Sequence, residues 1–265
     1  MINIHTCYGF KGDKSRFKVA LLTGYFDESG VHGADACVVA GFVGNDAQWQ
    51  ALAADWIPAI KPAKNLHLRT LRWKQHPEAV AKRLANLGPI PHKYNLKGVV
   101  AGIKWSDFNA IVKGKVTSRF ANAYQMCAYC AISVVLMEVA DDDDVYFIFD
   151  GQEGTRKEDM ERMRDIVYEW AGADRRVKGI DFMSRENTVC LDPADYLAYI
   201  VRERFVDPNS FKSQVGNSII GPGGYGGWIG AQQLIELVDD WTDKKRTIKQ
   251  RLAELSSHPY FRGPS

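Results

Sequence analysis

Two short apolar runs that each end in an aspartate constrain the fold of this chain most. The first begins at Val19 and ends in Asp27 and Glu28, and the second covers residues 145–149 and ends in Asp150. Runs this short and nearly free of charge are typical of strands buried on both faces of a sheet. Because successive side chains of a strand point to opposite faces, Asp27 and Glu28 cannot both face one site. We therefore expect one of these two acids to be structural.

The remaining sequence predicts further strands and helices in an order that suits an α/β fold. Apolar runs predict strands at residues 37–43, 97–105 and 177–183. Apolar stripes at helical spacing predict helices at residues 46–58 or 46–62, 77–87, 118–140, 155–171, 192–204 and 231–255. The expected N-caps are Asp46, Ser118 or Thr117, and Asp192. This order is compatible with a mixed sheet flanked by helices.

The chain length suits one large domain with additions. A chain of 265 residues can bury a substantial apolar interior. We expect an N-terminal arm at residues 1–18, a main domain at 19–210 with an insertion around 45–92, and a glycine-rich loop and C-terminal helix at 211–265 that pack on the same domain. The glycine-rich residues lack the Gly-Lys-Ser/Thr ending of a phosphate-binding P-loop. The acidic run at 141–144 is expected to be a solvated turn.

The composition excludes several classes of protein. A net charge of +2 is too small to indicate a nucleic-acid binder by itself, so a phosphate-binding surface would have to come from local clustering. Five cysteines without regular spacing argue against a disulfide framework and favour the cytoplasm. Cys127 and Cys130 fit a buried helix face better than a metal or redox site. The longest uncharged stretch, residues 121–137, is too short for a membrane span, so no membrane partner is expected.

Three segments of the sequence together resemble one known family. They are Tyr25-Phe26-Asp27-Glu28-Ser29-Gly30, the strand that ends in Asp150, and residues 191–204. With these segments the chain resembles domain-of-unknown-function family 3800, a bacterial family of ribonuclease-H-like proteins. The resemblance implies a ribonuclease-H-like mixed five-stranded sheet flanked by helices, with helical and loop insertions.

The resemblance also implies where the acids meet. In the ribonuclease-H-like arrangement the first and fourth strands lie side by side and parallel, which would bring Asp27 and Asp150 to the same edge. A helix after the last strand supplies another acid. Asp195 fits this role, because the sequence from Leu191 to Asp195 is similar to the family's L-x-x-A-D motif. Pro193 departs from the family pattern, in which Gln or a similar residue is expected.

Three carboxylates gathered at one point predict a divalent metal site. Without compensating charge they would repel one another and take up protons. Hard oxygen ligands select Mg²⁺ or Mn²⁺. We expect Asp27 to bridge two ions, Asp150 and Asp195 to bind one each, and Glu28 or Glu153 to complete the catalytic site. Each acid also has a structural alternative: the helix macrodipole favours an acid at 195, the acid at 150 can cap its strand, and the acid at 28 can pair with an arginine.

A basic segment at residues 61–75 suits a groove that follows a nucleic-acid backbone. The candidate nucleic-acid-binding residues are His67, Arg69, Arg72, Lys74 and Arg202. Solvated loop charge is the alternative for the segment, and a satisfied loop histidine is the alternative for position 67. The C-terminal helix carries apolar residues in a seven-residue series, so it is expected to pack on the core or on a partner subunit in a homo-oligomer.

These features predict phosphodiester hydrolysis. The main hypothesis is a metal-dependent nuclease that acts on RNA or DNA. A role in bacterial or phage defence is implied by the resemblance alone. The first alternative is a catalytically inactive nucleic-acid-binding or scaffold protein with the same fold. The second is a metal-dependent phosphatase that acts on a small substrate.

Overall fold

The structure, a computed structural model, describes most of the chain between residues 21 and 242. The described residues are 21–30, 35–71, 73–113, 120, 122–140, 142–151, 161, 164–165, 175–221 and 225–242. The predicted arm at 1–18, most of the predicted helix at 155–171 and the end of the predicted C-terminal helix lie outside them.

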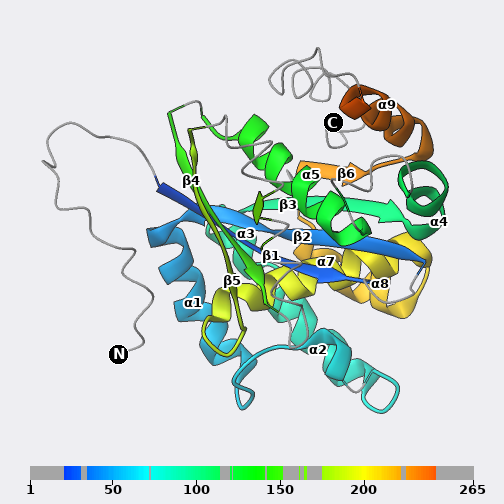
Figure 1. The fold of residues 1–265 in the computed structure, drawn as a ribbon. Helices are drawn as coiled ribbons and strands as arrows, with labels where there is room; N and C mark the ends of the chain where they lie inside the picture. The colour runs from blue at the N-terminus through cyan, green and yellow to red at the C-terminus, as the bar shows by residue number, and fades with distance from the viewer. Residues whose placement is uncertain are drawn as a thin grey trace, which may run out of the picture.

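A mixed sheet of six strands forms the centre of the described structure (Figure 1). The strands are β1 (Leu21–Ser29), β2 (Ala36–Asn45), β3 (Lys97–Lys104), β4 (Asp144–Asp150), β5 (Val177–Met183) and β6 (Tyr225–Trp228). Their order across the sheet is β5-β4-β1-β2-β3-β6. The β1–β2 and β2–β3 pairs are antiparallel, and the other three pairs are parallel. The α/β fold and the parallel pairing of the first and fourth strands agree with the sequence prediction.

The sixth strand corrects the prediction of five strands and of a loop at residues 221–230. β6 pairs with β3 in a register that places Gly226 opposite Val100. Gly226 has a φ of +90°, and a Cβ atom there would lie 2.0 Å from the Val100 carbonyl oxygen. A glycine-rich segment shows no apolar periodicity, yet here the glycines permit the close approach that pairs the strand.

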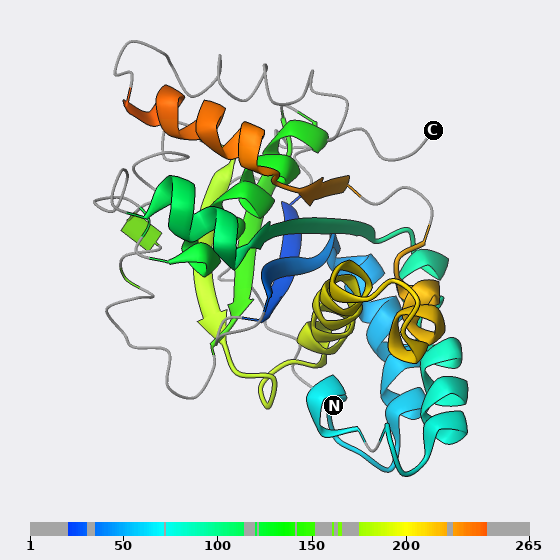
Figure 2. The same ribbon diagram turned by 90° about the vertical axis from the view of Figure 1, so that its right-hand side faces the viewer.

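Helices cover both faces of the sheet. They are α1 (Asp46–Ile60), α2 (Pro77–Leu87), α3 (Ile90–Lys93), α4 (Trp105–Asp107), α5 (Ala123–Glu138), α7 (Asp192–Val206), α8 (Phe211–Gly216) and α9 (Ala231–Thr242), with short 3₁₀ or π segments at Leu68–Thr70, Phe108–Val112, Val189–Leu191 and Asn217–Ile219. Figures 1 and 2 show α5 and α9 on one face, and α1, α2 and α7 on the other. The predicted insertion at 45–92 therefore contributes α1 and α2 to the same core.

Three helix starts differ from the sequence prediction by a few residues. Asn45, not Asp46, caps α1, because its side chain accepts from the Gln48 N–H and Gln48 bonds back in a capping box. Asn122 caps α5 in place of Ser118 or Thr117. Asp192 lies inside the first turn of α7 instead of capping it. Asparagine competes well for cap positions, so neighbouring polar residues are hard to rank from sequence alone.

The described part of the C-terminal helix packs on its own chain. Leu234 and Val238 of α9 are buried in the same apolar cluster as α5. Cys37, Cys127, Cys130 and Cys190 are buried and free. Among the helices of the described residues, none has the length and apolar character needed to cross a bilayer.

Candidate functional site

Three buried aspartates from three different elements converge on the guanidinium of Arg185. Arg185 Nη2 lies 2.7 Å from Asp27 Oδ2, Nε lies 2.7 Å from Asp150 Oδ2, and Nη1 lies 2.9 Å from Asp195 Oδ2. The exposed fraction is 0% for Asp27 and 6% for both Asp150 and Asp195. The structure therefore brings together the three acids that the sequence singled out.

The strand register explains why two of these acids meet. β1 and β4 are parallel neighbours with Phe26 opposite Phe149, so the next residues, Asp27 and Asp150, lie side by side. The rings of Phe26 and Phe149 stack at 5.3 Å in the cluster beneath α5. Because side chains alternate along a strand, both aspartates point to the opposite face, where α7 brings in Asp195.

Arg185 is the central residue of the site, and the sequence analysis did not select it. It lies in the short connection between β5 and α7. A signal was present, because it is the only lysine or arginine between Lys178 and Arg202, just before the acid-rich start of a helix. Burial alone would lower its pKa, but Asp27, Asp195 and Asp150 raise it, so the guanidinium stays charged.

The segment around His67 closes the site from the side of α7. The backbone N–H of Leu66 donates to Asp192 Oδ2 at 2.9 Å, and the N–H of Leu68 donates to Asp195 Oδ2 at 2.9 Å. Between them, His67 Nδ1 lies 2.7 Å from Arg185 Nη1. A guanidinium can only donate, so this nitrogen is the acceptor. Its 3.4 Å separation from Asp195 Oδ2 is therefore a contact between two acceptors.

Asp192 is a second residue whose role the sequence analysis missed. Besides the bond from Leu66, Asp192 Oδ2 accepts from Trp56 Nε1 at 3.2 Å, and Oδ1 has no hydrogen-bond partner among the described residues. Burial raises the pKa of Asp192 to about 7, while the bonds from Leu66 and Trp56 oppose that rise. The carboxyl ties the segment at 66–68 to α7 from inside the protein.

The strand register places Glu28 opposite Val39 on the face that α5 covers, as the strand alternation predicts, and its carboxyl also interacts with Asp27. It is half-buried near Tyr124 of α5, and its Oε2 atom is inaccessible and has no hydrogen-bond partner among the described residues. Burial raises the pKa of Glu28 to about 8, and the negative charge of Asp150 adds to this effect. An inaccessible carboxyl oxygen without a partner is costly unless a proton or cation compensates it.

The negative charge of the site exceeds its positive charge. Burial raises the pKa of Asp27 well above its usual value, and the charges of Glu28 and Asp195 raise it further, while Arg185 opposes them. Three aspartates face one arginine, so full ionisation would leave two negative charges uncompensated. The arrangement can therefore attract protons or a cation.

With Arg185 in this position the Oδ2 atom of each aspartate is already bound to the guanidinium. Within the described ranges, no group of three or more His, Cys, Asp or Glu side chains stands close enough to share one metal ion. The donor chemistry nevertheless fits Mg²⁺ or Mn²⁺, because the converging atoms are carboxylate oxygens and two negative charges remain to be balanced.

The predicted nucleic-acid-binding residues have different positions. His67 lies in the site, and Arg69 and Lys74 are exposed on the segment beside it. Arg202 lies two turns along α7 from Asp195, with its guanidinium carbon 5.4 Å from the centre of the Tyr199 ring and Nη2 2.5 Å from a Glu203 oxygen. Arg72 and Glu153 fall outside the described residues.

A cluster of aromatic and cationic side chains continues from the site along α7. The Trp73 and Tyr199 rings stack with their centres 6.0 Å apart. Lys212 Nζ donates to the Tyr199 hydroxyl at 2.6 Å and lies 5.6 Å from the centre of the Trp73 ring. Trp73 Nε1 in turn donates at 3.0 Å to the carbonyl of Leu68, whose own N–H donates to Asp195. Positive charge therefore lies one turn beyond the acids.

Comparisons with known proteins returned no protein-family model that matches the chain and no curated protein that matches it. The geometry of the acid site is thus the main support for a functional proposal.

Proposed function

We propose that this protein is a divalent-metal-dependent nuclease that hydrolyses phosphodiester bonds. The observation that carries the proposal is the convergence of Asp27, Asp150 and Asp195, from β1, β4 and α7, on one buried point. A sheet does not need three acids in one place in order to fold, because burial of apolar residues there would cost less free energy. A buried carboxyl with a raised pKa, as Asp27 has, is typical of functional sites.

The charge balance supports a divalent cation as the missing partner. Asp27, Asp150 and Asp195 would hold Mg²⁺ or Mn²⁺, and the cation would compete with Arg185 for the same oxygens. Such ions supply an activated water and stabilise the departing oxygen of a phosphodiester. A rotation of the Arg185 side chain would free the carboxylates without any movement of the strands. Its planar guanidinium would then be available to bind a phosphate group of the substrate.

The sheet topology also supports the proposal that the chain is a divergent ribonuclease-H-like protein similar to domain-of-unknown-function family 3800. β1 and β4 are parallel neighbours that each carry an aspartate at the same edge, and α7 follows the last of the strands on that side. The added strand β6 lies at the opposite edge of the sheet from β5. A nucleic-acid substrate would run past His67, Arg69 and Lys74 and toward Arg202.

One observation favours the alternative of a nucleic-acid-binding or scaffold protein without turnover. Arg185 satisfies the three aspartates in place of a metal ion, and a salt-bridge network of this kind can be purely structural. The two functions differ in their response to divalent cations. A nuclease needs them, whereas the alternative binds nucleic acid in their absence and leaves it intact.

A cleavage assay tests the proposal. Mixed RNA and DNA substrates are incubated with the protein and Mg²⁺ or Mn²⁺, with and without EDTA. We expect cleavage that EDTA abolishes, and Asp27→Asn should lower the rate roughly 100-fold or more, which corresponds to about 3 kcal/mol of transition-state stabilisation. Asp55→Asn is the matched control. This exposed carboxylate lies away from the site, and its Oδ2 atom pairs with Lys93 Nζ at a distance of 2.6 Å.

Three outcomes separate the hypotheses. Intact polymer under all conditions, with unimpaired binding, would support the inactive binding protein. Hydrolysis of a chromogenic phosphate ester without cleavage of polymer would support a phosphatase. Cleavage that survives in both EDTA and Asp27→Asn would contradict the metal mechanism.

A further inference from the structure

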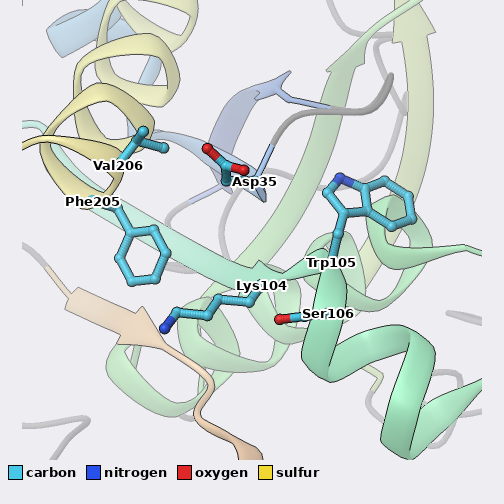
Figure 3. Close-up of a pocket in the computed structure, with 6 residues that line it drawn as sticks. All are labelled: Asp35, Lys104, Trp105, Ser106, Phe205 and Val206. Atoms are coloured by element: carbon cyan, nitrogen blue, oxygen red, sulfur yellow. The ribbon is translucent and has the colours of Figure 1, made fainter.

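A cavity opens between the end of β3 and the end of α7. Its volume is about 520 Å³, and it is lined by Asp35, Lys104, Trp105, Ser106, Phe205 and Val206 (Figure 3). This volume is in the range of small-molecule sites in proteins. None of these six residues takes part in the aspartate site, so the cavity is a separate feature.

The two aromatic walls of the cavity are held in place by other contacts. Trp105 Nε1 donates to the Gly30 carbonyl at 2.8 Å, and the Trp105 ring makes an edge contact with Phe108 at 6.0 Å. Phe205 stacks on Trp228 of β6. Figure 3 shows Phe205 and Trp105 on opposite sides of the cavity. Fixed aromatic surfaces bind a flat ring at low cost in conformational entropy.

The polar groups of the cavity carry opposite charges. The Asp35 carboxylate and the Lys104 ammonium lie on different sides of the space between the aromatic rings (Figure 3). Both residues are exposed, and neither forms an ion pair with another described residue. The Lys104 ammonium lies 5.5 Å from the centre of the Phe205 ring. The cavity therefore offers a strong acceptor and a strong donor to the edge of a flat ligand.

We propose that this cavity binds a nucleobase, and guanine in preference to the others. Guanine carries two adjacent N–H donors that suit a carboxylate, and its O6 and N7 acceptors suit a lysine. Adenine and cytosine offer the carboxylate only an amino group, and uracil offers one imino group. Stacking on the aromatic walls would bind any base, so the charged pair supplies the preference.

The position of the cavity relates it to the aspartate site. Asp195 and Phe205 are both on α7, and ten residues of helix span about 15 Å. Gly30, which binds Trp105, follows Asp27 by three residues at the end of β1. Arg202 lies between the two places. Its side chain packs close to Gly30, because a Cβ atom added to this glycine would lie 3.0 Å from Arg202 Cδ. The inference rests on the proposed function in one respect. A nucleic-acid strand cleaved at the aspartates would place in the cavity a base that lies a few nucleotides from the cleaved bond.

Calorimetric titration in EDTA tests the cavity independently of cleavage. The probes are the four nucleoside monophosphates GMP, AMP, CMP and UMP, added to the full chain. We expect saturable binding of GMP that is about tenfold tighter than that of the other three, since one specific pair of base contacts contributes about 1–3 kcal/mol. Asp35→Asn should remove the preference for GMP, and Lys104→Met should weaken GMP binding about tenfold, the loss expected for one such contact.

A matched control is available on the same strand. Lys97 is the exposed lysine at the other end of β3, so Lys97→Met should leave GMP binding unchanged. Circular dichroism of each variant checks that the fold is retained. Absence of saturable binding, equal affinity for all four nucleotides, or equal effects of Lys97→Met and Lys104→Met would each overturn the inference. GMP binding without polymer cleavage would contradict the proposed nuclease and leave the cavity assignment intact.

Discussion

The two faces of the central sheet differ in what they bury. Beneath α5 the sheet contributes Phe26, Phe147 and Phe149 to a cluster that is almost wholly apolar. Beneath α7 the same strands bury Asp27 and Asp150. The first face gains free energy from the burial of these rings, with Glu28 as an exception, whereas the second must balance the charges of several carboxylates in a medium of low dielectric constant. The difference indicates that the α5 face specifies the fold and that the α7 face holds the candidate site.

The largest expected effect comes from removal of the central cation. Arg185→Met leaves three buried carboxylates without a cationic partner, and we expect the free energy of unfolding to fall by about 3–5 kcal/mol in EDTA. Divalent cations should restore part of this loss, because a ligand at 100 times its Kd stabilises the folded state by about 2.7 kcal/mol. Urea denaturation with and without Mg²⁺ measures both effects.

Two further variants control this experiment. Arg164→Met removes an arginine that faces one half-exposed carboxylate, Asp181, at 3.3 Å, so it should cost about 1 kcal/mol or less. If Arg185→Met does not fold, Arg185→Lys keeps one charge with fewer donors and should show an intermediate loss. A loss of stability at Arg185 that Mg²⁺ and Mn²⁺ do not reduce would mean that the network is structural only.

A cavity created by mutation on the α5 face should destabilise the protein, and divalent cations should not change the size of this loss. Ile132 of α5 is fully buried, and Ile132→Ala should lower the free energy of unfolding by about 2–4 kcal/mol. The lost contacts lie in the apolar cluster, so Mg²⁺ should stabilise the variant and the wild type equally. A larger cation effect in Ile132→Ala would show that the two faces are not independent.

An effect that depends on pH is expected at Asp192. Its pKa is raised to about 7 in the folded protein, so its contribution to stability is complete below the ordinary value and is lost as the pH rises through about 7. Asp192→Asn cannot ionise and keeps an acceptor for the bonds from Leu66 and Trp56. We expect the variant to match wild type near pH 4 and to exceed its stability at pH 8.5 by about 4 kcal/mol. Urea denaturation at both pH values measures the gap, and a gap that does not change with pH would contradict this reading.

The sequence predicts one face of the molecule better than the other. Period-two alternation and apolar runs identified the strands, the buried character of α5 and the opposite orientations of Asp27 and Glu28. Arg185 was missed because it lies in an irregular connection, where no local periodicity relates a residue to its distant partners. A local rule predicted Asp192 as a helix cap. Its carboxyl instead accepts two hydrogen bonds from residues far away in the sequence, Trp56 and Leu66. β6 was missed because a glycine-rich segment is usually a loop. Its pairing depends on a close approach to β3, which composition alone does not reveal.

Manganese binding tests the central claim most directly. The concentration of free Mn²⁺ can be followed by electron paramagnetic resonance as metal is added to wild type, Asp27→Asn and Arg185→Met. If the three aspartates form a cation site that Arg185 occupies, wild type binds Mn²⁺ saturably and Arg185→Met binds it more tightly. Asp27→Asn then binds Mn²⁺ at least tenfold more weakly than wild type, as expected for the loss of about 1.4 kcal/mol or more of binding free energy. Failure of both wild type and Arg185→Met to bind Mn²⁺ would contradict the account.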